Sequence, residues 1–494
     1  MLMLKRKILV SVRNCLWMAA CAMACSSCGS RQSAQAFKQG QLAPAPAAIS
    51  ADCEASTTPP PGATRVYIAL RDGIDGSGQS VDDARDGTTD AIFDSILRCY
   101  EEGCSGPRAV PPTENLIVCL GPGTFQTLGN YDALSNIPHP TAQGFRIGKG
   151  WKVHGQGPDQ TTVQLSNYLA ITQSNNPQNL PMGTGTNLVL TTASDSASGV
   201  EVSDLTVDAN YPALKQLASQ NGSKALNLEA IRLWSARGGN WIHNVNVINA
   251  AGEIGDTAQI FETFSVVVGS VIPNSSPLDN SGNIIENVAV SAFGGGKGVG
   301  IAVFNATAEV RNNRVTGYNI GYGGWSLGPA NFHDNAALDS TYGFNIDSLI
   351  NNGVRIESNH IASSHGYGLV IGGFGVYENL VIRGNTVAVR DPQSIGLLFT
   401  GNVAHSVVAG NTFLVEDTGS GATAIRNIVN TKQAGLNGSN IYQSNVIDSH
   451  LGVAFDAPSL LSLNCSFGNH DEKGNPRSDM ADTSAVPCVT LGNI

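Results

Sequence analysis

Charged side chains are scarce in this 494-residue sequence, where Asp, Glu, Lys and Arg together make up only 14% of the residues. Proteins that bind nucleic acids neutralise phosphates with clustered Lys and Arg. Here 28 basic residues stand against 39 acidic ones, and the formal net charge is −11. The composition therefore argues against a nucleic-acid partner. With 41% hydrophobic residues the chain can still form a large core, which excludes a mainly disordered protein.

Long apolar runs are also missing. A helix that crosses a bilayer needs about 20 consecutive apolar residues, and the longest candidate, between Arg13 and Ser26, is shorter than that. This run follows a basic start that includes Lys5, Arg6 and Lys7. The pattern is typical of a bacterial secretory signal, which we assign to residues 1–28. We therefore expect an extracytoplasmic protein without a spanning helix.

Small residues precede three cysteines of this signal and resemble the lipobox of bacterial lipoproteins, without its usual Leu. We favour lipidation at Cys28, Cys25 or Cys21, which would anchor the chain in the outer or the cytoplasmic membrane. The alternative is cleavage near Ala24 and secretion. Residues 29–63 have the composition of a flexible linker, which suits an anchored domain. Loss of the signal removes four basic residues and no acid, so the net charge falls from −11 to −15.

Six cysteines follow the signal, an even number in a compartment that permits disulfides. The disulfide candidates are Cys53, Cys99, Cys104, Cys119, Cys465 and Cys488. A local scheme would pair Cys465 with Cys488 and form two bridges among the other four. Zinc sites need paired close spacings, and only Cys99 and Cys104 lie close together, so we predict no metal site for these cysteines.

Asparagine is abundant where charge is not, with 43 residues, 30 of them between positions 201 and 450. Many belong to a six-residue repeat: an apolar residue, any residue, a small residue or Asn, an Asn, any residue and a second apolar residue. The central residues of its copies are Asn313, Asn335, Asn359, Asn385, Asn411 and Asn445. Looser copies occur around Val245 and Val288. Because Asn tolerates a left-handed backbone and its amide can stack between repeats, these residues predict recurring turns.

A second motif of four or five residues lies between the Asn copies, as in Tyr342–Ile346 and Tyr367–Ile371. Its apolar residues alternate and Gly or Asn marks its ends, which indicates a short strand and excludes a helical repeat. Each repeat unit is therefore interpreted as three short strands. Ile92, Ile96 and Tyr100 recur instead at helical spacing and predict a helix that caps the first coil.

The repeat resembles a right-handed parallel β-helix of the pectin-lyase-like superfamily. That resemblance implies an all-β, three-sheet solenoid with an N-terminal capping helix. We expect a single domain over residues 64–490, with an N-terminal cap over about 64–165 and a C-terminal cap over about 456–490. Such a solenoid grows by adding coils and needs a cap at each end.

Many members of this superfamily cleave or epimerise acidic polysaccharides along the first sheet, but fold alone does not carry an activity over. The residue sets of the galacturonan hydrolases, the pectate lyases and the mannuronan epimerases are absent, and Ser364-His365-Gly366 is only a partial echo of the first. The sequence thus identifies no enzyme branch.

Candidate residues follow from the strand register. In Tyr342–Asp347, Phe344 and Ile346 should point inward, which turns Asn345 and Asp347 outward. Asp347 and His365 are the candidates for acid–base work, because His exchanges protons near neutral pH and a carboxylate either orients it or binds Ca²⁺. The candidates for substrate contact are Arg232, Trp234, Lys297, Tyr318, Trp325, Tyr342, Asn345 and Tyr367. The tyrosines could instead form a packing ladder.

Two functions remain open at this stage. The first is an exported polysaccharide lyase or glycoside hydrolase that acts on an extracellular polysaccharide, with or without Ca²⁺. The second is a non-catalytic envelope protein that binds glycans or forms a surface rod. Substrate, metal requirement and oligomeric state stay undetermined. An outward column of residues alternates in charge, for which mutual ion pairing is a sufficient explanation: His243, Glu286, Arg311, His333, Glu357 and Arg383.

Overall fold

The computed structural model describes most of the chain after position 50. The described residues are 51–54, 58–72, 76–88, 114–127, 130–132, 145–166, 186–192, 197–220, 227–235, 237–252, 264–270, 277–325, 327–347, 350–364, 366–372, 376–391, 394–415, 422–428, 440–449, 451–455 and 465–476. Several predictions lie outside them. These are the signal, the lipidation sites, most of the linker, the capping helix, Cys99, Cys104, His365 and Cys488.

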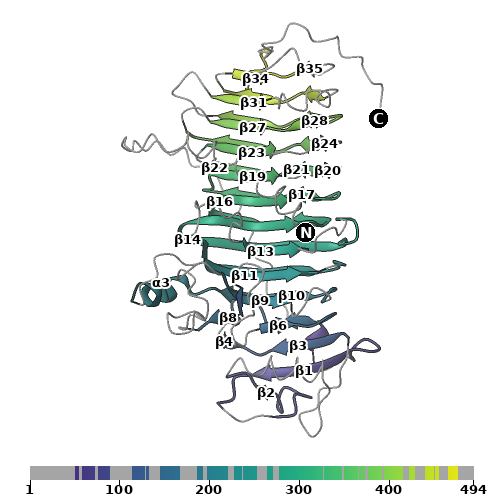
Figure 1. Cartoon of the computed structure of the whole chain (residues 1–494), viewed down its shortest axis with the longest axis vertical. Coiled ribbons are helices and arrows are strands. Elements are labelled where there is room, and N and C mark those ends of the chain that lie inside the picture. The colour runs from purple at the N-terminus through teal and green to yellow at the C-terminus, as the bar shows by residue number, and fades with distance from the viewer. Residues whose placement is uncertain are drawn as a thin grey trace, which may run out of the picture.

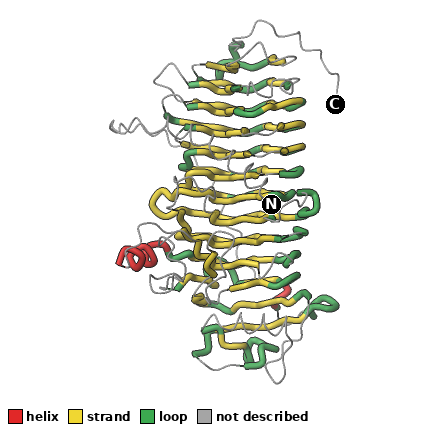
Figure 2. The backbone as a smooth tube through the Cα atoms, viewed as in Figure 1, coloured by secondary structure: helices red, strands yellow, loops and turns green. Residues whose placement is uncertain are grey.

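Strands stack along the long axis of the molecule, from β1 (Thr64–Ala69) at one end to β35 (Cys465–Phe467) at the other (Figure 1). Successive coils pair in parallel and link 32 strands into one continuous sheet. The chain therefore folds as a right-handed parallel β-helix, as predicted. Figure 2 shows strands along nearly every coil and the helix α3 (Tyr211–Gln220) on one flank.

Each coil contributes to three faces, which we call the first, second and third sheets. The first sheet contains the tyrosine strands of the sequence repeat. Its members are β6 (Phe145–Ile147), β9 (Thr186–Thr192), β11 (Asn227–Trp234), β13 (Phe264–Gly269), the last part of β14 (Asn283–Phe304), the last part of β16 (Arg314–Trp325), β19 (Tyr342–Asp347), β23 (Tyr367–Gly372), β27 (Ile395–Phe399), β31 (Thr423–Asn427) and β34 (Leu451–Phe455). The short β5 (Asn130–Asp132) joins its edge antiparallel to β9.

The second sheet precedes the Asn turn of each coil. It contains β1, β35 and the first parts of β10 (Glu201–Asp208), β12 (Trp241–Gly252) and β14. Its other members are β2 (Arg85–Asp86), β3 (Leu116–Leu120), β7 (Lys152–His154), β15 (Ala308–Arg311), β17 (Asn331–His333), β21 (Arg355–Glu357), β25 (Val381–Arg383), β29 (Val407–Ala409) and β32 (Ile441–Gln443).

The third sheet follows the Asn turn. Besides the later parts of β10 and β12, the middle of β14 and the start of β16, it contains β4 (Gly123–Thr127), β8 (Thr161–Leu165), β18 (Ala336–Leu338), β22 (His360–Ser364), β26 (Thr386–Val389), β30 (Thr412–Val415) and β33 (Val446–Asp448). A separate small sheet lies at one corner and consists of β20 (Ile350–Asn352), β24 (Val376–Glu378) and β28 (Asn402–Ala404). A short 3-10 helix, η1 (Ala51–Cys53), is the first described element.

One hydrophobic cluster fills the interior of the stack from Val66 to Ile447. Alternate residues of each strand enter it, as Phe344 and Ile346 of β19 do with no exposed surface. Near the start of several first-sheet strands a glycine has no room for a side chain. A Cβ atom on Gly343 would lie 2.5 Å from the Ile361 side chain and 2.6 Å from the carbonyl oxygen of Gly368. The glycines of the second sequence motif are thus packing residues.

Asparagine side chains form a ladder along the turn between the second and third sheets. Asn359 shows the pattern, since its Nδ2 donates to Phe332 O at 2.9 Å and to Asn385 Oδ1 at 3.0 Å. Its own Oδ1 accepts from the backbone N and the Nδ2 of Asn335, both at 3.0 Å. The same bonds continue to Asn469, and all of these side chains are buried. The ladder satisfies backbone groups that the turn leaves without a strand partner.

The left-handed residue of this turn is not the ladder Asn, which corrects the prediction. It is the residue before, with φ values of 55° at Asn312, 56° at Asp334 and 55° at Ser358, and glycine at positions 384 and 410. In the looser copies, Asn244 and Asn287 adopt the left-handed conformation with φ of 53°, and a Val stands in the ladder position. The ladder residues are therefore selected for hydrogen bonding, and their neighbours for backbone conformation.

Candidate functional site

Strand pairing arranges the outward residues of the first sheet in columns. One column joins Arg232, Val267, Ala302, Gly323, Asn345, Val370, Leu398 and Arg426. The next joins Trp234, Gly269, Phe304, Trp325, Asp347 and Gly372. The outward direction predicted for Asn345 and Asp347 agrees with the burial of their neighbours Phe344 and Ile346 in the core.

A second apolar cluster, separate from the core, lies on this face. Its buried members are Phe264, Val267, Val299, Ala302 and Ile320. Four half-buried aromatic residues pack against it, and we call them the aromatic platform: Trp234, Phe304, Trp325 and Tyr342. Trp234 meets Phe304 edge to face with ring centroids 5.8 Å apart, and Trp325 meets Phe264 in the same way at 5.4 Å. Rings held in this way are suited to stack on sugar rings.

The position of Trp325 depends on the absence of a side chain at Gly323. A Cβ atom at position 323 would lie 2.3 Å from both Cη2 and Cζ3 of the indole. The two residues are on the same strand and the same face, so the ring folds back over the glycine. The outer edge of the indole thus occupies the space that a side chain at position 323 would fill.

Asp347 is in direct register with Trp325 on the neighbouring strand. Its side chain is half-buried, and within the described part of the chain no hydrogen bond or ion pair reaches its carboxylate. Burial raises the pKa of Asp347 from 3.8 to about 6, because a desolvated carboxylate is less stable than its neutral form. Asp347 can therefore give up or accept a proton close to neutral pH.

The tyrosines divide into two groups. Tyr342 and Tyr367 are paired in register and stack with centroids 5.4 Å apart and an interplanar angle of 6°. Tyr318, predicted to be their equivalent, is not, because Ile320 is the residue opposite Tyr342. Tyr318 is only 2% exposed, and its hydroxyl accepts a hydrogen bond from Ser265 Oγ at 2.8 Å. The prediction of a sugar contact at Tyr318 was wrong.

Arg232 points outward as expected but has a partner on its own strand. Its Nε donates to Glu229 Oε2 at 2.6 Å, and Glu229 Oε1 accepts from the backbone N of Phe264 at 3.2 Å. Both side chains are buried, and the guanidinium also lies 5.8 Å from the Trp234 ring centroid. Of Lys297, only the backbone is described, within β14. His365 lies outside the described residues.

The charged column on the second sheet pairs internally, as the sequence indicated. Arg311 Nη2 contacts Glu286 Oε2 at 2.7 Å, and Arg383 Nη2 contacts Glu357 Oε1 at 3.1 Å. His333 contacts both Glu309 and Asp334. Burial lowers the pKa of His333, but its hydrogen bonds to Asp334 and Glu309 outweigh this and leave the pKa raised. These residues stabilise the coil and offer no open site.

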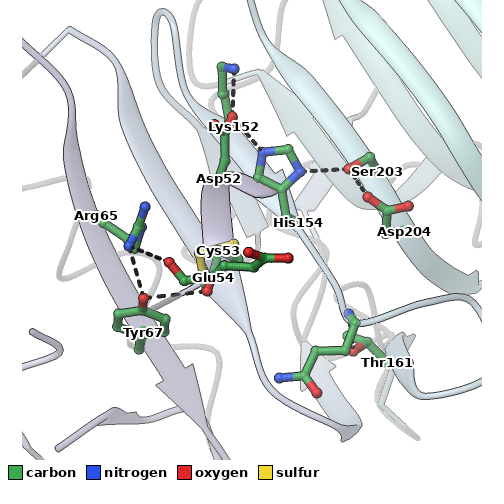
Figure 3. Close-up of a disulfide and its surroundings, with 12 residues drawn as sticks. Asp52, Cys53, Glu54, Arg65, Tyr67, Lys152, His154, Thr161, Ser203 and Asp204 are labelled. Carbon is green, nitrogen blue, oxygen red and sulfur yellow. Dashed lines mark hydrogen bonds and ion pairs between the residues drawn. A yellow bond between two sulfur atoms is a disulfide. The ribbon is translucent and has the colours of Figure 1, made fainter. Parts of the chain in front are cut away.

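The sequence did not predict one polar cluster that the structure contains. It lies on the second sheet near the N-terminal end and contains Asp52, Lys152, His154, Glu201, Ser203, Asp204 and His243. Figure 3 shows Asp52, Lys152, His154, Ser203 and Asp204 of this cluster. Its residues come from β7, β10, β12 and η1, and no local motif connects positions so far apart. Only the alternation of Lys152 and His154 with Val153 hinted at two outward polar residues on one strand.

His154 is the centre of this cluster and is 1% exposed. Its Nδ1 lies 2.6 Å from Ser203 Oγ, whereas Nε2 has no hydrogen-bond partner among the described residues and lies 3.7 Å from Asp52 Oδ2. Burial lowers the pKa of His154 more than the nearby Glu201, Asp52 and Asp204 raise it. Lys152 Nζ contacts Asp52 Oδ2 at 2.8 Å and Glu201 Oε2 at 3.2 Å, so an ammonium group already balances these acids.

A disulfide between Cys53 and Cys119 ties η1 to β3 and holds Asp52 over the cluster (Figure 3). One bridge among the four N-terminal cysteines is thus confirmed. Cys99, Cys104, Cys488 and the side chain of Cys465 lie outside the described residues.

In the part of the chain that is described, no three His, Cys, Asp or Glu side chains converge to hold a metal ion. No helix among the same residues is long and apolar enough to cross a membrane.

Comparison with solved structures returns other parallel β-helices at low identity. The Dettilon tailspike protein aligns with 82% of this chain and 68% of its own, at 13% identity and a TM-score of 0.49. The periplasmic alginate epimerase AlgG aligns over 75% of each chain at 12% identity and a TM-score of 0.41. The catalytic domain of a GH87 alpha-1,3-glucanase aligns with 88% of this chain and 70% of its own, at 11% identity and a TM-score of 0.38.

These proteins are right-handed parallel β-helices of the pectin-lyase-like superfamily, and the likeness is one of fold. No protein-family model matches the sequence, and no curated protein matches it.

Proposed function

We propose that this protein acts on a polysaccharide that lies along the outer face of the first sheet, with Asp347 as the group that exchanges a proton with it. One observation carries the proposal. The Asp347 carboxyl is half-buried in register with Trp325, has no partner among the described residues, and has a pKa raised to about 6. A carboxyl group left unpaired beside a fixed aromatic ring is costly for stability, which supports a functional reason for it.

The aromatic platform and Asp347 support different parts of this function. Trp325 offers a half-buried ring, held by the Phe264 ring, on which a sugar can stack. Asp347, one strand further along the stack, would then face an oxygen or a C–H group at the edge of that sugar. A group with a pKa near the working pH transfers protons most effectively, and such catalysis contributes about 10²–10⁴ in rate.

A non-catalytic glycan-binding role is the second candidate, and the composition of the face favours it. Hydrolysis by two carboxyl groups needs them about 5–9.5 Å apart. The described residues in register with Asp347 and with its neighbour Asn345 are Trp325, Gly372, Gly323 and Val370, none of which is acidic. We further propose export to the cell envelope, which the basic and apolar start of the sequence and the Cys53–Cys119 bridge support.

Purified protein should be incubated with a panel of soluble polysaccharides, with and without Ca²⁺, and assayed for new reducing ends and for unsaturated uronates. The matched variants are Asp347→Asn and Asp448→Asn, since Asp448 is an exposed carboxylate on the third sheet. Activity that Asp347→Asn removes and Asp448→Asn leaves unchanged supports the enzyme. Binding without products, unaffected by Asp347→Asn, supports the second candidate.

A further inference from the structure

We infer that the polysaccharide bound on the first sheet is an uncharged glycan and not a polyuronate. This inference rests on the proposed function and names the ligand class of the same site. It is drawn from the distribution of charge on the outer face of the first sheet, which the strand register makes explicit.

Between β13 and β27, three columns of residues run along this face. The start of each strand contributes Phe264, Val299, Ile320, Tyr342, Tyr367 and Ile395. The next column contributes Val267, Ala302, Gly323, Asn345, Val370 and Leu398. The last contributes Gly269, Phe304, Trp325, Asp347 and Gly372. Asp347 is the one charged residue among these described positions, and it is an acid.

Cations occur in these columns only beyond both ends of that stretch, among the described residues. Arg232 lies four strands before Asp347, which is about 19 Å at about 4.8 Å per strand. Its guanidinium is already paired with Glu229 at 2.6 Å, and both groups are buried. Arg426 lies three strands after Asp347, or about 14 Å along the stack. Neither is placed beside a sugar that stacks on Trp325.

A uronate carboxylate in this position would lose water without gaining a cation, which is unfavourable on a half-buried face. It would also approach the carboxyl of Asp347 and a protein of net charge −11. An uncharged sugar has no carboxylate to desolvate and is not repelled by the negative charge of the protein. Its C–H face can stack on Trp325, and its hydroxyl groups can bond to the amide of Asn345, which is in register with Gly323 next to the indole.

Affinity electrophoresis of the full chain tests the inference. The panel pairs neutral polymers (α-glucans, β-glucans, mannan, xylan) with polygalacturonate and alginate, between 20 and 500 mM NaCl. Product assays run in parallel on wild type and Asp347→Asn. We expect retardation by at least one neutral polymer and less than a twofold change in affinity across the salt range, because no ion pair contributes.

A gain-of-function pair makes the charge argument independent of folding defects. Val370 is half-buried and in register with Asn345, so Val370→Lys adds a cation next to the proposed subsite and Val370→Gln adds length without charge. We expect at least a tenfold gain in polygalacturonate affinity for the Lys variant alone. If the wild type bound only polyuronates, and salt weakened this binding, the inference would be overturned. If in that case the wild type still formed products and Asp347→Asn did not, the proposed function would stand. No binding and no products on either panel would overturn both.

Discussion

Asp347 and Trp325 occupy equivalent positions on consecutive coils, and strand pairing sets them directly side by side. Burial holds the pKa of Asp347 at about 6, and Trp325 is the residue opposite it on the neighbouring strand. The pairing places Trp325, the proposed stacking residue, next to Asp347, the proposed proton-exchanging residue. It also gives a direct way to test each residue through the other.

The first prediction concerns the pH profile of activity. Asp347→Asn should lower kcat by about 10²–10⁴ without loss of glycan binding, as removal of a proton-transferring group does. Trp325→Ala should admit water to the carboxyl, so the pKa of Asp347 should fall toward 3.8 and the limb of the profile near pH 6 should move to lower pH. Steady-state rates from pH 4 to 9 give both results. An unshifted limb in Trp325→Ala would assign it to another group.

The second prediction concerns Gly323. A methyl group there cannot coexist with the present indole position, so Gly323→Ala should displace Trp325 and weaken glycan binding about tenfold or more. The same substitution should have almost no effect when Trp325 is already Ala, which is the sign of a coupled pair. Dissociation constants for the four members of this cycle provide the measurement. Equal effects of Gly323→Ala in both backgrounds would show that it acts through the backbone instead.

The third prediction separates the two asparagines of one turn. Asn313→Ala removes the acceptor of Val288 N and the donor to Ile285 O, and it should destabilise the fold by about 1–3 kcal/mol per buried group left unpaired. Asn312 is exposed and left-handed with φ of 55°, so Asn312→Gly should change stability by only about 0.5 kcal/mol or less. Urea midpoints decide the case, and similar losses for both variants would contradict it.

The fourth prediction compares two histidines with opposite pH dependence. The pKa of His154 is lowered in the folded chain, so below about pH 6.5 the unfolded chain binds more protons and stability falls with falling pH. The pKa of His333 is raised, so its contribution is complete below about 6.5 and is lost as pH rises through the folded value. His154→Gln and His333→Gln should change the slope of stability against pH in opposite directions between pH 5 and 8. Slopes that change in the same direction would refute this.

The fifth prediction concerns the Cys53–Cys119 bridge, which spans 66 residues of sequence. Replacing both cysteines by Ser should cost about 2–5 kcal/mol in free energy of unfolding. It should also release η1, so that Lys152 loses its contact with Asp52. Protection of β7 backbone amides from hydrogen exchange should therefore fall more than that of β27. Uniform loss of protection along the coil would mean that the bridge acts only on global stability.

The architecture was readable from sequence because it repeats. Asn335, Asn359 and Asn385 recur in one local pattern, and the strand after each turn alternates in polarity, so three sheets and an inward face for Phe344 followed. The left-handed backbone was assigned to the wrong residue of the turn, where two neighbouring residues are of the same type. Asn312 and Asn313 are both Asn, and only the structure shows that the first takes the left-handed backbone and the second the ladder.

The site was less predictable than the fold, for a physical reason. Tyr318 and Tyr342 look alike in their local sequences, yet strand register is decided by the whole coil, and the β16–β19 pairing puts Ile320 opposite Tyr342. The cluster around His154 depends on residues of several coils and a disulfide, which no local pattern encodes. The outward position of Asp347 was inferred from alternation, but the lack of a hydrogen-bond or ion-pair partner for it among the described residues could not be.

Neighbouring residues of the Asn ladder keep the same hydrogen-bond distance although the number of residues between them varies. Asn385 and Asn411 are 26 residues apart and Asn411 and Asn445 are 34 apart, yet both pairs form the same backbone-to-amide hydrogen bond at 3.0 Å. Residues added to a loop are thus absorbed outside the ladder and do not shift the next coil. Loops can lengthen or shorten over evolution while the first sheet keeps its spacing, so new recognition elements can be inserted beside Asp347 without rebuilding the scaffold that positions it.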